Sequence, residues 1–413
     1  MSELEYREFK QNSIECREEF DQSCRNPSGC AVFGVINEGG KAFSGSMVME
    51  GISIMHERSN GLGGGFAAYG IYPQFKEDWV FHLFYDDIIS KKQTEDIIAK
   101  DFNILFSEEI PTSKVSSIKK SPIIYRYFLK IKNNSRFNEV DTSKRSFTNL
   151  NLKRILKQKE ETFIVEFVMK INSQVKGAYI ISSGKNMGIF KGVGYPEDIG
   201  EFFKIDEYNG YLWISHGRFP TNSVVWWGGS HPFGLLNWSV VHNGEISSYG
   251  TNKRYVSGFG YECTLSTDTE VITYLFDLLV RKLGVNLEII HTILAAPLWE
   301  EIELMDEDVR ELLKALRISY SSALLNGPFS IIVGNNNYMY ALNDRIKLRP
   351  MVAAKKGDYL FISSEEAAIR GVCISPDILW HPRGGEPVIG LINTKGSNAV
   401  ANSKNKSKIL DRI

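Results

Sequence analysis

The amino-acid sequence predicts a globular α+β protein, and three observations support this prediction. Hydrophobic residues make up 43% of the 413 residues, which is enough to bury a sizeable core and excludes a disordered chain. Short apolar runs typical of strands recur along the chain and alternate with separate blocks of helical periodicity. No stretch approaches the roughly 18 apolar residues that a membrane-spanning helix needs. Because the first ten residues also lack the apolar core of a signal peptide, we expect a cytoplasmic protein that does not bind a membrane.

Charge and cysteine usage exclude several classes of function. The 48 Lys+Arg and 49 Asp+Glu residues give a formal net charge of −1, which offers no global attraction for nucleic acid or an anionic membrane. The 5 cysteines are an odd number, no two have Cys-x-x-Cys spacing, and none is spaced from a histidine like a zinc ligand. We therefore expect no metal site, no iron–sulfur cluster and no disulfide framework in this chain. The remaining options are buried structural thiols and one reactive thiol.

The N-terminal part is predicted to be a polar leader followed by strands. Residues 1–29 are polar and end in the breaker cluster Asn26-Pro27-Ser28-Gly29. The apolar run that begins at Cys30 then predicts a buried strand. Further along we expect a helix at 48–58, a glycine-rich loop at 59–65 in which the backbone approaches other groups closely, and strands at 66–72 and 79–84.

A basic segment interrupts this pattern. Residues 113–159 contain thirteen Lys or Arg against two acidic residues, Glu139 and Asp141, and their periodicity is poor. Such a segment either docks a partner or an anionic ligand, or is a solvated excursion of the surface; we favour the excursion.

Strands and helices alternate in the C-terminal part. A helix is predicted from Asp268 onward, because apolar residues recur there at spacings of three and four, and the acidic residues of 300–311 accompany a second helix. The tail after Asn393 is polar and basic. Strands are predicted at 165–169, 178–182, 187–190, 211–216, 330–333, 339–342 and 359–363.

Four short segments concentrate unusual residue types, and each has an ordinary structural explanation. Cys30 in an apolar strand is, alone, more often a small core residue than a nucleophile, and Arg218 is suited to a surface ion pair. Asn243-Gly244 is a turn signal, and Thr267 with Glu270 makes a capping box. The segments are Ser28-Gly29-Cys30, His216-Gly217-Arg218-Phe219-Pro220-Thr221, Val241-His242-Asn243-Gly244-Glu245 and Ser266-Thr267-Asp268-Thr269-Glu270.

Together the four segments supply what attack on a carboxamide requires. A cysteine nucleophile needs a base, and a cysteine at a chain terminus can use its own α-amino group, which titrates near pH 8. The oxyanion of the tetrahedral intermediate needs donors, which an Asn side chain and a Gly backbone N–H provide. To bind a free amino acid, an Arg pairs with its carboxylate and an Asp pairs with its ammonium group.

The order of these motifs resembles that of the class II glutamine amidotransferases, the N-terminal-nucleophile hydrolase domain that releases ammonia from glutamine. The resemblance covers roughly residues 30–75 and 163–380, and five motifs in one order make it highly specific. They are Cys30, His216-Gly217-Arg218-Phe219-Pro220-Thr221, His231-Pro232-Phe233, His242-Asn243-Gly244-Glu245-Ile246 and Ser266-Thr267-Asp268-Thr269-Glu270.

The resemblance implies a role for each motif residue. Cys30 is the expected nucleophile, with its freed α-amine as the base. Asn243 and Gly244 are expected to form the oxyanion hole, while Arg218 binds the α-carboxylate of L-glutamine and Asp268 its α-amino group. The implied fold is a four-layer α-β-β-α sandwich, two antiparallel sheets packed face to face with helices outside.

Among the branches of the family, the chain looks most like the stand-alone amidotransferase subunit of glutamate synthases. Four segments carry this likeness: Phe219-Pro220-Thr221-Asn222-Ser223, Trp226-Trp227, Ser230-His231-Pro232-Phe233 and Asp344-Arg345-Ile346-Lys347-Leu348-Arg349-Pro350. It implies that this chain has no cofactor, and that flavin and iron–sulfur groups belong to a partner, the catalytic subunit of glutamate synthase, which accepts the ammonia. The basic segment is one candidate docking surface for it.

Two departures from the family pattern affect the expectation. Family members usually have Gly after the nucleophile, whereas this chain has Ala31, which is tolerable only where φ is negative. The α-amine of Cys30 is also free only if residues 1–29 are removed, so we predict cleavage between Gly29 and Cys30. The expected organisation is a leader at 1–29, an amidotransferase domain at 30–392 with an insertion at about 85–162, and a polar tail at 393–413.

Other interpretations of the same residues stay open. The ammonia acceptor is alternatively another amino-acid synthase, for example N-methylglutamate synthase. A catalytically silent, glutamine-binding regulatory subunit is a third reading, motivated by Ala31 and an uncleaved leader. His216 and His242 are expected to be structural hydrogen-bonding groups, and Trp226 and Trp227 either line the glutamine pocket or pack beneath a loop.

Overall fold

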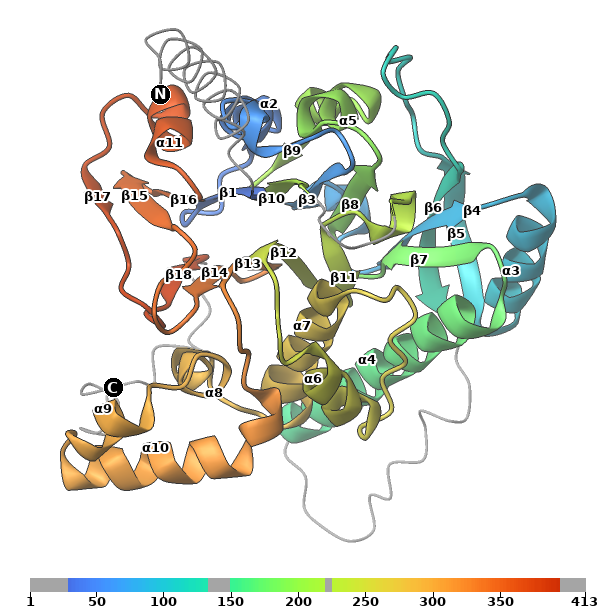
Figure 1. Cartoon of the computed structure of the whole chain (residues 1–413). Helices are drawn as coiled ribbons and strands as arrows, with labels where there is room; N and C mark the ends of the chain where they lie inside the picture. The colour runs from blue at the N-terminus through green and yellow to red at the C-terminus, as the bar shows by residue number, and fades with distance from the viewer. Residues whose placement is uncertain (1–28, 133–148, 220–224, 394–413) are drawn as a thin grey trace, which may run out of the picture.

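Two antiparallel sheets stacked face to face form the centre of the protein (Figure 1). The structure is a computed structural model that describes residues 29–132, 149–219 and 225–393. The larger sheet has the strand order β17 (Ile378–Trp380), β15 (Val352–Lys356), β16 (Tyr359–Ser363), β1 (Ala31–Asn37), β10 (Leu212–Gly217), β3 (Gly64–Tyr69) and β8 (Met187–Gly192). The smaller sheet has the order β11 (Phe233–Leu235), β12 (Trp238–Gly244), β13 (Phe329–Asn335), β14 (Tyr338–Asn343) and β18 (Val388–Leu391).

The layer between the two sheets is apolar along most of its length. Alternate residues of each strand point to the same face, so every second residue of β1, β3 and β10 turns toward the smaller sheet. Val32, Ala67 and Ile214 meet Val241 and Ile332 there, and all five are at most 1% exposed. This interior fixes the two sheets against each other and sets the position of the strand ends that carry the predicted site.

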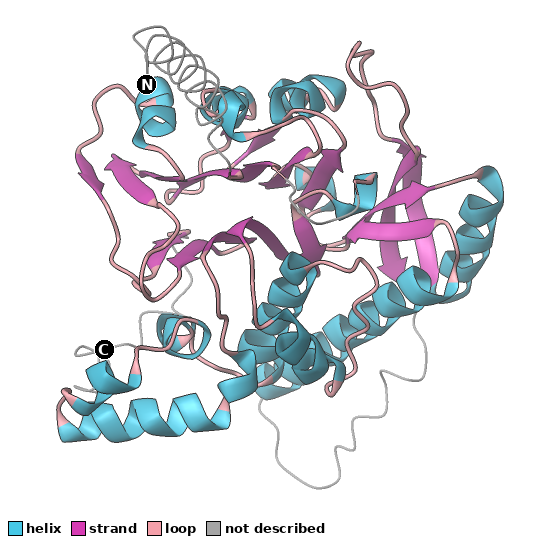
Figure 2. Cartoon of the chain, viewed as in Figure 1, coloured by secondary structure: helices cyan, strands magenta, loops and turns pink. Residues whose placement is uncertain are grey.

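Helices cover the outer face of each sheet (Figure 2). The helices α2 (Ser46–Ser53), α5 (Pro196–Phe202) and α11 (Glu366–Val372) lie over the larger sheet, where a second apolar cluster fills the contact. The helix α7 (Asp268–Phe276) packs on β11 and β12, and α6 (Tyr249–Ser257) packs on α7. The predicted α+β fold, a four-layer α-β-β-α sandwich, is therefore confirmed.

The chain between β3 and β8 forms a third sheet beside the sandwich. Its strand order is β5 (Phe102–Glu109), β6 (Ile123–Ile131), β4 (Trp79–Tyr85) and β7 (Ala178–Ser182), with the helices α3 (Ile88–Asp101) and α4 (Asn149–Gln174) packed on it. We expected an insertion at about 85–162; the elements of this added unit run from Trp79 to Ser182.

Two expectations about this region are wrong. Part of the basic segment is not a solvated excursion, because β6 is a central strand whose Tyr127 and Leu129 are fully buried between β4 and β5. Residues 165–169 belong to α4 and not to a strand. Ile164, Val168 and Ile171 bury one helical face there, and a short apolar run alone does not distinguish the two structures.

The remaining elements lie outside the three sheets described above. None of the helices in the three described ranges is both long enough and apolar enough to cross a bilayer. The predicted leader apart from Gly29, and the tail apart from Asn393, lie outside the described residues. The other elements are β2 (Phe43–Ser44), β9 (Asn209–Gly210), α8 (His291–Leu294), α9 (Trp299–Glu303), α10 (Glu307–Ser319), the π-helix η6 (Asp277–Lys282) and the 3-10 helices η1 (His56–Arg58), η2 (Pro73–Phe75), η4 (Ile205–Glu207), η5 (Trp227–Gly229), η7 (Leu287–Ile289) and η8 (Ser321–Ala323).

Candidate active site

The predicted site residues converge at one end of the sandwich, from both sheets and one helix. Cys30 immediately precedes β1 and Arg218 immediately follows β10, and these two strands are paired with Ala31 opposite Gly217. Asn243 and Gly244 are the last residues of β12 in the facing sheet, and Asp268 is the first residue of α7. Antiparallel pairing and sheet stacking thus bring together residues that are up to 238 positions apart (268 − 30).

Cys30 lies among hydrogen-bond donors and positive charges. The backbone N–H of Phe219 donates to Sγ of Cys30 at 3.3 Å, and Arg58 Nε donates to the Cys30 carbonyl at 3.3 Å. Burial raises the pKa of the thiol, although the Phe219 N–H and nearby guanidinium groups act in the opposite direction. The thiol is therefore protonated at neutral pH and needs a base before it can attack.

The two departures from the family pattern have different structural consequences. Ala31 has no positive φ and lies in β1, so its methyl group is accommodated. Gly29 has φ +151 and remains joined to Cys30, whose nitrogen is then an amide that cannot accept a proton. A Cβ placed on Gly29 would lie 3.2 Å from Arg349 Nη1, 3.3 Å from Arg58 Nη2 and 4.0 Å from Asn243 Oδ1.

Asn243 and Gly244 are held at the end of β12 by different constraints. Asn243 is fully buried and donates through Nδ2 to Ser364 Oγ at 3.3 Å, while its Oδ1 has no partner. An amide nitrogen carries two hydrogens, so a second one is available. Gly244 has φ +140, and a Cβ there would lie 1.9 Å from the Pro328 carbonyl oxygen, so only glycine fits.

Asp268 is a half-buried carboxylate kept in its charged form. His242 Nδ1 lies 3.5 Å from its Oδ1, and the Ile246 N–H donates to Oδ2 at 3.0 Å. Burial alone would raise the pKa of Asp268, but His242 and the hydrogen bonds outweigh burial and lower the pKa to about 2. The negative charge also acts on the Arg218 guanidinium, as expected of two groups that grip opposite ends of one amino acid.

Three hydrogen-bonded histidine rings, His216, His231 and His242, lie between these groups. His216 stacks on His231 with ring centroids 4.0 Å apart, and its Nε2 lies 3.0 Å from the His242 carbonyl oxygen. The hydroxyl of Thr269 joins His231 Nε2 at 2.7 Å and His242 Nδ1 at 3.3 Å. Burial lowers the pKa of His216 to about 3 and that of His231 well below its usual range, so neither ring is suited to proton transfer at neutral pH.

The start of α7 differs in detail from a capping box. The Thr267 side chain accepts from the Thr269 N–H at 3.3 Å, as an N-cap does. Glu270, however, accepts from the backbone N–H groups of Thr264 and Leu265, both at 3.0 Å. Glu270 therefore fixes the loop before Asp268 and not the helix end itself.

Three side chains without a predicted role also lie near Cys30. Arg58 and Arg349 flank Gly29, and Ser364 links Asn243 to β1 because its Oγ also accepts from the Val32 N–H at 3.1 Å. Arg58 stands directly before the glycine-rich loop, which is the one local signal that marks it. Pro220 and Thr221 of the predicted motif lie outside the described residues.

The two tryptophans have packing partners. Trp226 meets Tyr179 edge-on with ring centroids 4.9 Å apart. Trp227 packs in the same way on Phe84 at 5.9 Å and on Phe202 at 5.7 Å, and its Nε1 donates to the Lys120 carbonyl. Both side chains thus join the segment after Arg218 to the added unit.

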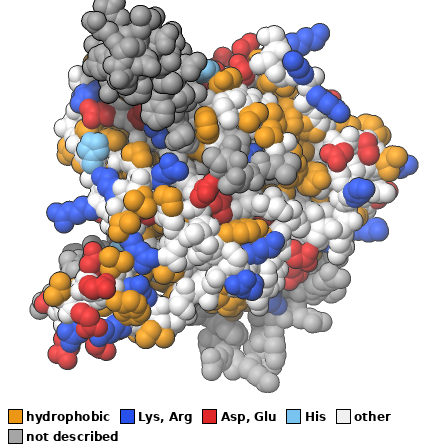
Figure 3. Space-filling model, in the orientation of Figure 1, with side chains coloured by type: hydrophobic (Ala, Val, Ile, Leu, Met, Phe, Trp, Pro, Cys, Tyr) orange, Lys and Arg blue, Asp and Glu red, His pale blue; other side chains and the backbone are white. Residues whose placement is uncertain are grey.

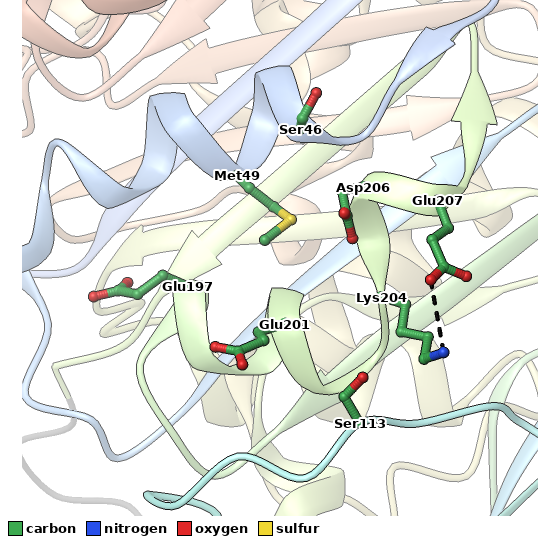
Figure 4. Close-up of a pocket in the computed structure, with 8 residues that line it drawn as sticks. All are labelled: Ser46, Met49, Ser113, Glu197, Glu201, Lys204, Asp206 and Glu207. Atoms are coloured by element: carbon green, nitrogen blue, oxygen red, sulfur yellow. Dashed lines mark ion pairs between the residues drawn. The ribbon is translucent and has the colours of Figure 1, made fainter.

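Other hollows lie away from Cys30. A pocket of about 500 Å³ beside α2 and α5 is lined by acidic side chains with Lys204 among them (Figure 4). Another of about 520 Å³ is lined by Arg345, Arg383 and His291.

On the face in Figure 3, charges of both signs are interspersed. Within the described ranges, no group of three or more His, Cys, Asp or Glu side chains could hold a metal ion.

Comparison with known proteins connects this geometry to a family. The model of the class II glutamine amidotransferases matches residues 86–269, a range that holds Arg218, Asn243, Gly244 and Asp268. Residues 86–269 therefore form part of a class II glutamine amidotransferase domain. Cys30 lies N-terminal to the matched range, immediately before the start of β1. The family assignment supports hydrolysis of the glutamine amide and transfer of ammonia in general.

Individual relatives differ in how much of this chain they match. An uncharacterized protein of Archaeoglobus fulgidus is 46% identical over 90% of this chain and 94% of its own length. The glutamine amidotransferase-like protein GlxB of Rhizobium meliloti is 27% identical over 49% of this chain. An amidophosphoribosyltransferase of Methanocaldococcus jannaschii is 24% identical over 49% of this chain. The chain spans 59% and 38% of the length of these two named relatives.

Proposed function

We propose that the protein hydrolyses the side-chain amide of L-glutamine through a thioester on Cys30, and delivers the ammonia to a separate synthase subunit. The observation that carries this proposal is the convergence of Cys30, Arg218, Asn243 and Asp268 at one end of the sandwich. Asp268 and Cys30 both lie near enough to Arg218 to act on its guanidinium group, which supports a site for an amino acid beside the thiol.

The acylation step begins with proton transfer from the thiol. Once the leader is removed, the α-amine of Cys30 accepts the Sγ proton, and the sulfur attacks the amide carbon of glutamine. Asn243 Nδ2 and the Gly244 N–H stabilise the resulting oxyanion. The ammonium returns its proton to the amide nitrogen, the C–N bond breaks, and ammonia leaves behind a glutamyl thioester.

The deacylation step uses water with the same groups. The α-amine takes a proton from the attacking water, the oxyanion forms again in the same hole, and the C–S bond breaks. L-Glutamate leaves, and the proton returns to the sulfur. Arg218 and Asp268 hold the α-carboxylate and the α-ammonium group throughout, so the substrate is not displaced between the two steps.

The proposed acceptor is a flavin-containing glutamate synthase subunit. The support is the likeness of the long loop after Arg218 and of Asp344-Arg345-Ile346-Lys347-Leu348-Arg349-Pro350 to glutamate synthase amidotransferases. Free ammonia would diffuse away, so this function requires a docked partner.

Hydrolysis is tested by the products that the purified protein makes from L-glutamine. We expect glutamate and ammonia in equal amounts, and no ammonia from D-glutamine, whose α-groups cannot meet Arg218 and Asp268 with the amide at Cys30. Enzymatic assays of both products give the ratio. A sample whose N-terminus is Cys30 and which releases no ammonia would refute the proposal.

The acceptor is tested by affinity capture of the tagged protein from its native host. We expect a flavin-containing synthase subunit to co-purify, and glutamine-dependent glutamate synthesis in the captured complex. Recovery of a different amino-acid synthase would contradict this choice of acceptor and leave the hydrolysis proposal intact.

A further inference from the structure

Ser230 carries a buried hydroxyl that no group in the protein satisfies. The residue is fully buried, and its Oγ has no hydrogen-bond partner. A buried hydroxyl without a partner is costly, so such a group needs an explanation, and one explanation is a ligand. Its position in the fold decides what that ligand is.

The hydroxyl lies beside the Arg218 side chain, across Gly63. A Cβ placed on Gly63 would lie 2.8 Å from Ser230 Oγ and 3.0 Å from Arg218 Cδ, so these two atoms are no further apart than the sum of those distances. Gly63 has φ +157, and its carbonyl accepts from the Arg218 N–H at 2.8 Å. The absence of a side chain at Gly63 is what lets Ser230 approach the arginine.

Ser230 is mounted on a segment that is fixed on both sides. The Gly228 carbonyl accepts from Lys191 Nζ at 2.8 Å. Lys191 is itself 1% exposed and lies over the Phe233 ring at 4.1 Å. On the other side, His231 is held by Thr269 and by stacking on His216. The hydroxyl therefore cannot reach a distant partner without disturbing both anchors.

We propose that Ser230 is a further substrate-binding residue, whose hydroxyl donates to the α-carboxylate of glutamine alongside the Arg218 guanidinium. A guanidinium has only donors, so the hydroxyl gains no acceptor from Arg218 itself. A carboxylate has about four lone-pair sites, which accept both guanidinium N–H groups and one hydroxyl. This inference rests on the proposed function, because it deepens the recognition of the same substrate.

The test compares substrates with and without the α-carboxylate. Ser230→Ala is expected to lower kcat/KM for L-glutamine by about 10- to 100-fold, mainly through KM. For glutaramate, which keeps the carboxylate and lacks the α-amine, kcat/KM should fall by a similar factor. For 4-aminobutanamide, which lacks the carboxylate, kcat/KM should change less than about twofold. All three substrates are compared on the same variant. A reduced fraction of folded protein would therefore lower all three kcat/KM values equally and would not change their ratios.

Ser182→Ala is the matched control. Ser182 Oγ is another buried hydroxyl without a partner, on β7 of the added unit, and its loss should leave all three kcat/KM values within about twofold of the wild type. An equal loss by Ser230→Ala on all three substrates would overturn the proposal. If the wild type released no ammonia, the proposed function would fail, and calorimetric binding of L-glutamine and 4-aminobutanamide to both proteins would still decide the role of Ser230.

Discussion

Replacing Cys30 with alanine is expected to abolish release of ammonia from glutamine, with a loss on the order of 10⁴-fold or more. Alanine removes the atom that forms the thioester, while Arg218 and Asp268 remain. In a chain that begins at residue 30, the variant should therefore still bind L-glutamine, which isothermal calorimetry measures on the same sample. Loss of hydrolysis with retained binding separates a nucleophile from a residue that only shapes the pocket.

Cys263→Ala is the matched control for this result. Cys263 is also a free, partly buried thiol, and burial raises its pKa to about 12. It packs against the apolar cluster on the outer face of the smaller sheet. Its replacement should leave ammonia release within about twofold of the wild type. Substantial hydrolysis by the Cys30 variant would exclude the thioester mechanism.

Local patterns in the sequence predicted the strands of the sandwich well. The strand at 359–363 coincides with β16, and that at 211–216 lies within one residue of β10. These strands are buried on both faces, so they are continuous apolar runs bounded by polar residues. The same criterion failed for 165–169, because a buried helical face inside α4 also shows a short apolar run.

Only the site residues that belong to sequence motifs were predicted. Cys30, Arg218, Asn243, Gly244 and Asp268 stand in short, recognisable segments, and the structure brings all five together. The positions of Arg349 and Ser364 near Cys30 depend instead on which strands pair and in what register, as with the contact between Ser364 and Val32. No local pattern encodes a contact across 332 positions.

Removal of residues 1–29 is expected to switch the enzyme on. In the uncleaved chain the Cys30 nitrogen is an amide, and burial keeps the thiol protonated, so neither the base nor the thiolate is present. A chain that begins at Cys30, after removal of an initiator Met, should hydrolyse glutamine. A chain that begins one residue earlier, at Gly29, should be slower by on the order of 10³-fold.

Intact mass and ammonia release, measured on the same samples, test this prediction. Protein purified from its host should have the mass of residues 30–413 when it is active. Full hydrolytic activity in a sample with the mass of all 413 residues would show that the α-amine of Cys30 is not the base. The pair of chains that differ only by Gly29 controls for any effect of the rest of the leader on folding.

The position of Gly29 gives the leader a second inhibitory effect. The residue lies between the guanidinium groups of Arg58 and Arg349, and it faces Oδ1 of Asn243. The peptide at this position thus occupies space beside the proposed oxyanion hole, where the amide of glutamine must enter. The chain that begins at Gly29 should therefore bind L-glutamine more weakly than the chain that begins at Cys30, by about tenfold or more in calorimetry. Equal affinity in the two chains would restrict the role of cleavage to freeing the amine.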